Sequence, residues 1–334
     1  MGEAAPLARR RGTASAHAGT GRRGWRFTAR RAAGLSLAAL LVPVVVRWTG
    51  WEVGPLAIVV SFMPWFAVAS AVPLALALAA RSRVLIAATA AVSLLCVAWV
   101  APLYSGDSAD GEPVLSVATV NLLYGQADAD AVVRMVAEYH IDLIAVQELT
   151  PDAVVGLRAA GLEELLPFSQ VLAESGAGGV GLWSRVEFED AAEVGGMTFS
   201  AGRADVTVGD ARLALLVVHP AAPGPMEHER WGQDMDRLAK ILGEETGAVM
   251  VAGDFNTTRD HRAFRDLEAM GYVDAADQAD SGFGPTFPQG RLPMPVVVID
   301  HVLARDAGLV AIESLTVVIP GTDHRALIAI YADA

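Results

Sequence analysis

Long apolar runs fill the first third of the chain, and shorter apolar runs alternate with polar segments beyond them. Residues 53–80 and 84–106 carry no charge, and each stretch exceeds the roughly 20 residues that cross a bilayer. A third run reaches bilayer length if Arg47 snorkels to the interface. A cleaved signal peptide is the alternative for this first run, but the two longer runs behind it favour a span. The pattern predicts three transmembrane helices at about residues 32–51, 55–80 and 84–103.

The arginines around these runs predict the orientation. Eight Arg precede the first run, and Arg81 and Arg83 lie between the second and the third. Cytoplasmic flanks of membrane helices carry the excess of Lys and Arg. We therefore expect a multi-pass cell-membrane protein with residues 1–31 as a basic cytoplasmic tail, residues 104–113 as a linker and residues 114–334 as an extracellular domain.

Within residues 114–334, short β-branched runs alternate with helical patterns. Residues 114–120, 141–148 and 248–254 are typical of strands, whereas residues 226–245 and 259–270 have the periodicity of helices. A hairpin is predicted at Gly209-Asp210. This mixture predicts a layered α/β domain with much antiparallel sheet.

Composition and charge exclude several classes of protein. Hydrophobic residues make up 53% of the chain and there is a single Cys, which excludes a disordered chain and a disulfide-stapled scaffold. Residues 1–106 contain eleven Arg and two Glu, a net charge of +9. Because the whole chain has a net charge of −13, the residues beyond 106 have a net charge of −22. An acidic domain repels the phosphate backbone of nucleic acid, and we expect no nucleic-acid partner.

Polar side chains follow or end several of the apolar strands. One of them alone is explained by a helix cap, a solvated strand end or a structural histidine. Their repetition at strand ends instead favours a shared cleft. These residues are Asn121, Glu148, His219, Asp254, Asn256, Asp300, Asp323 and His324.

The order of these residues resembles the endonuclease/exonuclease/phosphatase superfamily. The fold of this superfamily is shared by pancreatic-type deoxyribonuclease, abasic-site endonucleases, inositol polyphosphate 5-phosphatases and bacterial sphingomyelinases. The resemblance implies a deoxyribonuclease-like α/β fold, a four-layer sandwich of two packed mixed sheets flanked by helices, and a metal-dependent phosphoric ester hydrolase. It rests on TVN at 119–121, QE at 147–148, VVHP at 217–220, GDFN at 253–256, ID at 299–300 and TDH at 322–324.

Cleavage of a phosphate ester needs a hard cation that neutralises the phosphate oxygens, and Mg²⁺ prefers oxygen ligands. We expect Mg²⁺, with Mn²⁺ as the alternative. Glu148 is the first expected ligand. Asn121 and Asp323 are expected to hold the metal directly or through water.

The remaining residues are candidates for the chemical step. Asp254 is expected to activate water, beside Asn256 as a phosphate contact. His219 and His324 are expected to donate to the phosphoryl oxygens, and Asp300 to orient His324. Whether Asp254 or a histidine activates the water stays open.

Five other polar residues lie outside this set. His301 directly follows Asp300 on a predicted strand and points to the opposite face. Glu174 is a candidate for the acid that orients His219. Three further histidines are interpreted as surface residues: His140, His228 and His261.

Three functions remain open. The first is a membrane-anchored phosphoesterase acting on a lipid-linked phosphate or pyrophosphate of the cell envelope. The arrangement of three spans followed by such a domain is similar to that of actinobacterial membrane proteins of the VanJ type. Those proteins are associated with resistance to the glycopeptide teicoplanin. The others are a surface nuclease or sphingomyelinase-like phospholipid phosphodiesterase, and an inactive binding module, which would have lost at least one of the motif residues.

Overall fold

The computed structural model describes residues 17–105, 111–209, 211–224 and 228–334, with side chains from Gly24 onward. Part of the predicted tail (residues 1–16) and of the predicted linker (106–110) therefore lies outside the described residues, as does Asp210 of the predicted hairpin.

Three helical stretches are long and apolar enough to cross a membrane: Gly24–Thr49, Met63–Ala80 and Arg83–Tyr104. The first belongs to helix α1 (His17–Thr49). The second combines α3 (Met63–Ala69) with α4 (Ala71–Ala80), and the third combines α5 (Arg83–Val100) with the 3₁₀ turn η1 (Ala101–Tyr104). A separate short helix, α2 (Pro55–Val60), begins with Pro at its first turn and lies between the first two stretches.

The described chain divides into two compact units. One holds residues 17–44 and 65–97, and the other holds residues 45–64 and 98–334. The connection between the first two candidate spans thus belongs to the same unit as the C-terminal domain. Its Ala57 is fully buried in that unit's core, in the same hydrophobic cluster as Leu216 and Phe264.

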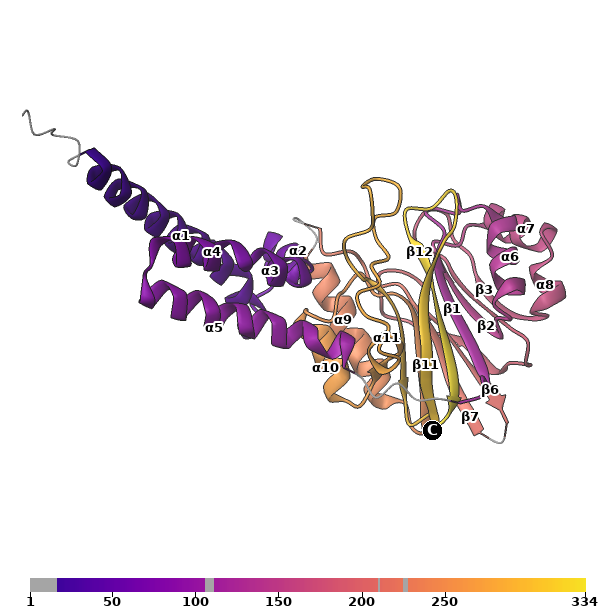
Figure 1. Cartoon of the computed structure of the whole chain (residues 1–334). Helices are drawn as coiled ribbons and strands as arrows, with labels where there is room; N and C mark the ends of the chain where they lie inside the picture. Colours follow the sequence, from indigo (N-terminus) through magenta and orange to yellow (C-terminus); the bar gives the residue numbers. More distant parts are fainter. Residues whose placement is uncertain (1–16, 106–110, 210, 225–227) are drawn as a thin grey trace, which may run out of the picture. The chain divides into compact units, whose positions relative to one another are not determined.

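Two six-stranded mixed sheets form the C-terminal domain (Figure 1). Strands β1 (Leu115–Asn121) and β2 (Leu143–Gln147) are parallel, as are β7 (Ala211–Val218) and β8 (Ala248–Asp254), and the other neighbours are antiparallel. The first sheet has the order β11 (Leu309–Val318), β12 (Arg325–Asp333), β1 (Leu115–Asn121), β2 (Leu143–Gln147), β4 (Val180–Ser184) and β3 (Phe168–Leu172). The second has the order β5 (Glu189–Glu193), β6 (Gly202–Val208), β7 (Ala211–Val218), β8 (Ala248–Asp254), β10 (Asp300–Arg305) and β9 (Val273–Asp274).

Apolar side chains alternate along these strands and fill the space between the sheets, as Val117, Leu215 and Val302 do. The outer face of the first sheet is covered by α6 (Ala129–Glu138), α7 (Pro151–Ala159) and α8 (Leu162–Leu165). The outer face of the second is covered by α9 (His228–Glu244) and α10 (Arg262–Ala269), while the short α11 (Ala275–Gln278) follows β9 (Figure 1). The four-layer sandwich predicted from the sequence is confirmed.

Candidate active site

The sheet register brings the predicted residues to one end of the domain. Asn121 ends β1 and pairs with Gln147 of the parallel β2, so Glu148 follows at the same edge. In the second sheet, Asp254 at the end of β8 pairs with Asp300 at the start of the antiparallel β10. Residues more than 100 positions apart therefore meet because their strands end together.

The sequence around Asp254 is shaped by close backbone packing. A side chain at Gly253 would meet the carbonyl oxygen of Val218 at 2.1 Å, so only glycine allows β7 and β8 to approach here. Phe255 is fully buried in the core. Asn256 has a φ of 47°, in the left-handed region that Asn tolerates better than most residues. The GDFN sequence thus turns the chain sharply at the end of β8.

Asp254 is the centre of the cluster. Its Oδ2 atom lies 3.5 Å from Nε2 of His219 and 3.6 Å from Nε2 of His324. The same oxygen accepts Nδ2 of Asn121 at 3.0 Å, and Oδ1 accepts the backbone N–H of Asn256 at 2.9 Å. Burial raises the pKa of Asp254, but the charges of His324 and His219 outweigh burial and lower it to about 2. The carboxylate is therefore ionised at neutral pH.

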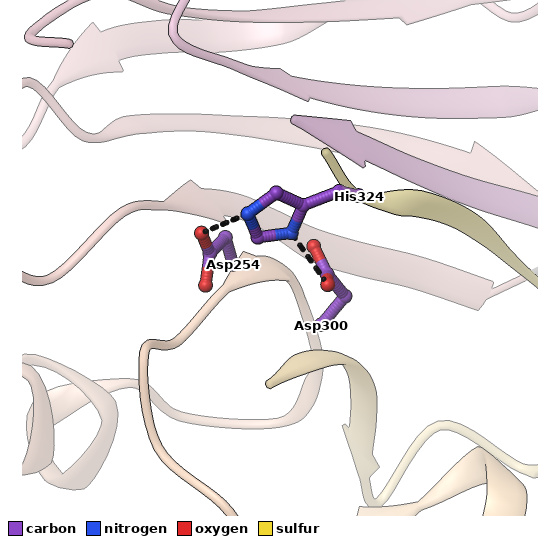
Figure 2. Close-up of side chains that lie close together, drawn as sticks. All are labelled: Asp254, Asp300 and His324. Atoms are coloured by element: carbon purple, nitrogen blue, oxygen red, sulfur yellow. Dashed lines mark hydrogen bonds and ion pairs between the residues drawn. The ribbon is translucent and has the colours of Figure 1, made fainter. Parts of the chain in front are cut away.

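His324 lies between two carboxylates (Figure 2). Its Nδ1 donates to Oδ2 of Asp300 at 2.9 Å, while Nε2 faces Asp254. Burial lowers the pKa of His324, but the charges of Asp300 and Asp254 outweigh it and raise the pKa to about 10. The ring of Phe287 lies 4.9 Å from that of His324, and Thr286 Oγ1 accepts the backbone N–H of Asp300 at 3.4 Å. His324 is an imidazolium at neutral pH.

His219 directly follows β7 and is oriented by the backbone. Its Nδ1 donates to the carbonyl oxygen of Ala177 at 3.2 Å, which leaves Nε2 facing Asp254. The expected acid partner, Glu174, instead accepts the hydroxyl of Ser200 at 2.7 Å. Burial lowers the pKa of His219, but the hydrogen bond and charge of Asp254 outweigh it and raise the pKa.

Glu148 and Asn121 form the adjoining part of the site. Glu148 has a φ of 53°, a conformation that costs free energy in a non-glycine residue and recurs at functional sites. Its Oε1 accepts Nδ2 of Asn121 at 3.1 Å, and its Oε2 accepts the backbone N–H of Tyr124 at 2.7 Å. Asn121 Oδ1 accepts the backbone N–H of Leu123 at 2.9 Å. The Asn121 amide nitrogen therefore bridges Glu148 and Asp254.

Asp323 closes the site from the chain segment before β12. Its Oδ2 pairs with the guanidinium of Arg291 at 2.8 Å, and its Oδ1 lies 4.0 Å from Nε2 of His324. Thr322 donates its hydroxyl to the carbonyl of Asn121 at 2.8 Å and accepts the backbone N–H of His324 at 3.1 Å. All eight predicted site residues thus belong to one connected network.

Sequence reasoning missed three side chains that border this network. Arg291 is 64% exposed and is the only charged residue in the segment 284–295, a signal that could have marked it. Phe287 packs against His324, with the two ring centroids 4.9 Å apart. Phe199 stacks on His219 with ring centroids 5.0 Å apart, and no sequence pattern pointed to it.

Two other histidines are buried away from the network. His301 faces the opposite side of β10 from Asp300, as predicted, and hydrogen-bonds to Asp274 and the Thr257 carbonyl. The interpretation of His261 as a surface residue was wrong, because it is fully buried. His261 directly precedes α10, and its ring makes an edge-to-face contact with Trp231 at a centroid distance of 5.2 Å. Helical periodicity does not reveal this contact.

The family model of the Endonuclease/Exonuclease/phosphatase family matches residues 118–324, and the chain belongs to this family. No curated protein sequence matches the chain. Among solved structures it is similar to TDP2 from D. rerio complexed with single strand DNA product, with 17% identity, a TM-score of 0.54 and coverage of 65% of this chain and 98% of that one.

Two further structures have the same fold. An AP endonuclease from Archaeoglobus fulgidus is 17% identical with a TM-score of 0.54, covering 65% of this chain and 99% of the other. An endonuclease/exonuclease/phosphatase from Beutenbergia cavernae is 17% identical with a TM-score of 0.53, covering 67% and 72%. At 17% identity, the similarity to these structures shows only that the fold is the same. Members of the matched family are typically hydrolases of phosphoester bonds and generally depend on a divalent metal.

The side chains present fit such a cation. Asp254, Asp300 and His324 offer ligand atoms within 4.8 Å of one another, but both His324 nitrogens already face carboxylates (Figure 2). Carboxylate oxygens, as Glu148 and Asp323 offer, are the ligands that Mg²⁺ or Mn²⁺ prefers, although neither residue belongs to a group of three such side chains within 4.8 Å among the described residues. Asn121 would have to turn its amide over to present oxygen.

Proposed function

We propose that the protein is a membrane-anchored, metal-dependent phosphoesterase that cleaves a lipid-linked phosphate or pyrophosphate. The observation that carries this proposal is the packing of segment 45–64, the connection between the first two candidate spans, into the catalytic unit. A flexible tether would leave the distance between active site and membrane open, whereas this segment restricts it.

Three polar contacts hold segment 45–64 in place. Arg47 Nε donates to Oδ1 of Asp260 at 2.6 Å, with the two side chains 10% and 3% exposed. His261 Nε2 donates to the carbonyl of Ala57 at 2.8 Å. The backbone N–H of Arg262 donates to Oε1 of Glu52 at 2.8 Å. These bonds bind residues 47, 52 and 57 of the segment to residues 260–262 at the start of α10.

We propose roles for the site residues on the basis of this geometry. Glu148 and Asp323, with Asn121, would hold the cation, which supplies neutralisation of the phosphate charge when bound. The imidazolium of His324 and the Nε2 of His219 would donate to the phosphoryl oxygens.

Asp254 lies between both histidines and would orient the attacking water. A carboxylate with a pKa near 2 is a weak base at neutral pH, so orientation and charge are its main contributions. Asp300 would hold the His324 ring. Asn256 donates Nδ2 to the carbonyl of Pro220 at 3.0 Å and would have to release it to contact phosphate.

The proposed location of the catalytic unit is the extracellular face of the cell membrane, because the Arg-rich flanks favour a cytoplasmic N-terminus. A reporter that is active only outside the cytoplasm should be active when fused after Ala334 and inactive when fused after Arg83. The opposite pattern would place the catalytic unit in the cytoplasm.

The substrate class we propose is a polyprenyl phosphate or pyrophosphate carrier of the cell envelope, with a role in teicoplanin resistance as in the VanJ type. The full chain in nanodiscs with Mg²⁺ should be offered polyprenyl pyrophosphate, phosphatidylglycerol, sphingomyelin and duplex DNA. We expect release of phosphate from the polyprenyl lipid to be fastest. Faster turnover of sphingomyelin would instead indicate a phospholipid phosphodiesterase.

A nuclease is the second candidate, because the fold is shared with a TDP2 bound to DNA and an AP endonuclease. The net charge of −22 beyond residue 106 opposes it. Phosphate contacts by Lys and Arg make nucleic-acid binding fall steeply with salt. Efficient DNA cleavage at low salt that disappears as salt rises would replace the lipid proposal by the nuclease.

A further inference from the structure

A cavity of about 290 Å³ lies in the catalytic unit on the side of segment 45–64. Part of its wall comes from segment 45–64 and η1, and part from the loop after α11 and from β11 and β12. The apolar residues of the wall are Pro64, Leu103, Phe283, Val298, Leu315 and Leu327.

Each charged group on the wall already has a partner of opposite charge inside the domain. The four pairs are Asp260 with Arg47, Asp274 with His301, Asp277 with Arg259, and Asp300 with His324. The other polar side chains of the wall are neutral hydroxyls, as in Ser61 and Thr316. Burial, followed by the charge of Asp274, raises the pKa of Asp277 to about 7, which agrees with a poorly hydrated wall. A metal ion or an anionic group finds no free partner among these residues.

The connectivity of the chain places the cavity at one end of the candidate spans. Pro64 lies at the start of the second span and Leu103 at the end of the third. If each stretch crosses the bilayer once, these two ends emerge on the same face. Two residues of the cavity wall are then the membrane-side ends of their spans on that face.

The cavity volume suits part of an apolar chain. An apolar cavity of about 150 Å³ accepts benzene, so about twice that volume accepts roughly a dozen carbon atoms. On its inner side the cavity reaches Asp300, whose Oδ2 accepts the hydrogen bond from His324. One residue therefore borders both the cavity and the catalytic network.

We propose that this cavity binds the apolar chain of a membrane lipid next to the catalytic histidine. The inference rests on the membrane anchoring stated under the proposed function. Two sources share this chemistry, the chain of the lipid-linked substrate and that of a bulk phospholipid, and competition separates them.

The test uses a variant that fills the cavity. A side chain at Gly284 would start 3.8 Å from Cγ2 of Thr316, an ordinary contact, so Gly284→Phe is accommodated by the backbone and occupies the space. Ser314→Phe fills the same cavity from β11. Gly195→Phe is the matched control, because Gly195 has no neighbour that a side chain would meet and lies outside the cavity wall.

The full chain is reconstituted in phosphatidylcholine and phosphatidylglycerol vesicles that contain a diazirine-labelled palmitoyl phosphatidylcholine, and is then irradiated. We expect crosslinks on peptides containing Phe283 or Leu315. Either filled variant should lose these crosslinks at least about tenfold, the loss expected from excluding two buried methylene groups. Gly195→Phe should keep them. Displacement of the label by polyprenyl pyrophosphate identifies the substrate chain, and no displacement identifies bulk phospholipid.

Two measurements separate failure of the cavity from failure of the proposed function. Hydrolysis of bis-p-nitrophenyl phosphate reports the catalytic network in all variants and should be unchanged. Absence of the crosslinks from a wild-type chain that hydrolyses polyprenyl pyrophosphate overturns the cavity and leaves the function. Crosslinks in a chain that hydrolyses only DNA support the cavity and overturn the function.

Discussion

Asp254 and Asp260 are both buried and lie close together in sequence, yet their surroundings differ. Asp254 faces two histidines and an amide, while Asp260 is paired with the guanidinium of Arg47. Burial raises the pKa of Asp260 above its usual value, whereas the histidines bring that of Asp254 to about 2. A buried carboxylate therefore needs a partner in both places. The identity of the partner determines whether the carboxylate serves the proposed chemistry, as at Asp254, or holds two segments together, as at Asp260.

The histidines repeat this contrast. His324 has carboxylates at both ring nitrogens and a pKa raised to about 10. His261 accepts the backbone N–H of Thr258 at 2.9 Å and donates to Ala57, which fits a neutral ring. Burial lowers its pKa to about 4, despite the opposing hydrogen bonds. One buried imidazole is therefore kept charged, and the other is kept neutral to hold segment 45–64.

The largest effect is expected from removing the metal or its first ligand. EDTA should abolish phosphoesterase turnover, and added Mg²⁺ should restore it in the wild type. Glu148→Gln should lower kcat by more than about 100-fold, because losses of this size follow even from changes around metal ligands. Glu163→Gln, at a half-exposed ion pair with Arg158, is the control. Turnover that persists in EDTA would contradict a metal site.

Asp254→Asn should lower kcat about 10²- to 10³-fold, the loss that follows removal of a group that orients reactants and stabilises charge at the reacting centre. Its circular dichroism should stay that of the wild type, because an amide keeps the bond to the Asn256 backbone. Asp260→Asn should show the reverse, with reduced stability and nearly normal kcat in the fraction that stays folded. Equal kcat losses in both variants would remove the distinction between the two neighbourhoods.

Arg47→Met should lower the free energy of unfolding of the full chain by about 3 kcal/mol, because Asp260 would remain buried without its partner. Denaturation in detergent measures this. Lys240→Met removes an exposed ion pair with Glu244 and should change stability by less than about 1 kcal/mol. The double variant Arg47→Met/Asp260→Leu should recover most of the loss. A double variant as unstable as the single one would show that the pair itself is not responsible.

His261 should make stability fall as the pH drops. Its folded pKa of about 4 lies below the unfolded value of about 6.5, so the unfolded chain binds the extra proton between these values. The resulting loss in the free energy of unfolding reaches about 3 kcal/mol near pH 4 and vanishes above pH 6.5. His261→Gln should flatten the plot of the free energy of unfolding against pH between pH 4 and 6.5, and the substitution His140→Gln at an exposed position should leave this plot unchanged. Parallel curves for wild type and His261→Gln would contradict a neutral buried ring.

The catalytic domain was largely readable from the sequence because its signals are local. Alternating apolar strands predicted the sheets, and polar residues at strand ends predicted the network of Asn121, Glu148, Asp254 and His324. Adjacent residues on a strand point to opposite faces, which predicts that Asp300 and His301 face different sides of β10. The three long apolar runs likewise marked the candidate spans by length and composition alone.

Contacts between distant segments were decided only by the tertiary structure. Nothing local to Ala57 or His261 indicates that they meet across about 200 residues, so His261 was misread as exposed. The exposed loop residue Arg291 reached Asp323, and the Ala177 carbonyl replaced the expected acid beside His219. Hydrophobic periodicity records which face of an element is buried, but not against what, because the partner is chosen by how whole sheets and helices pack.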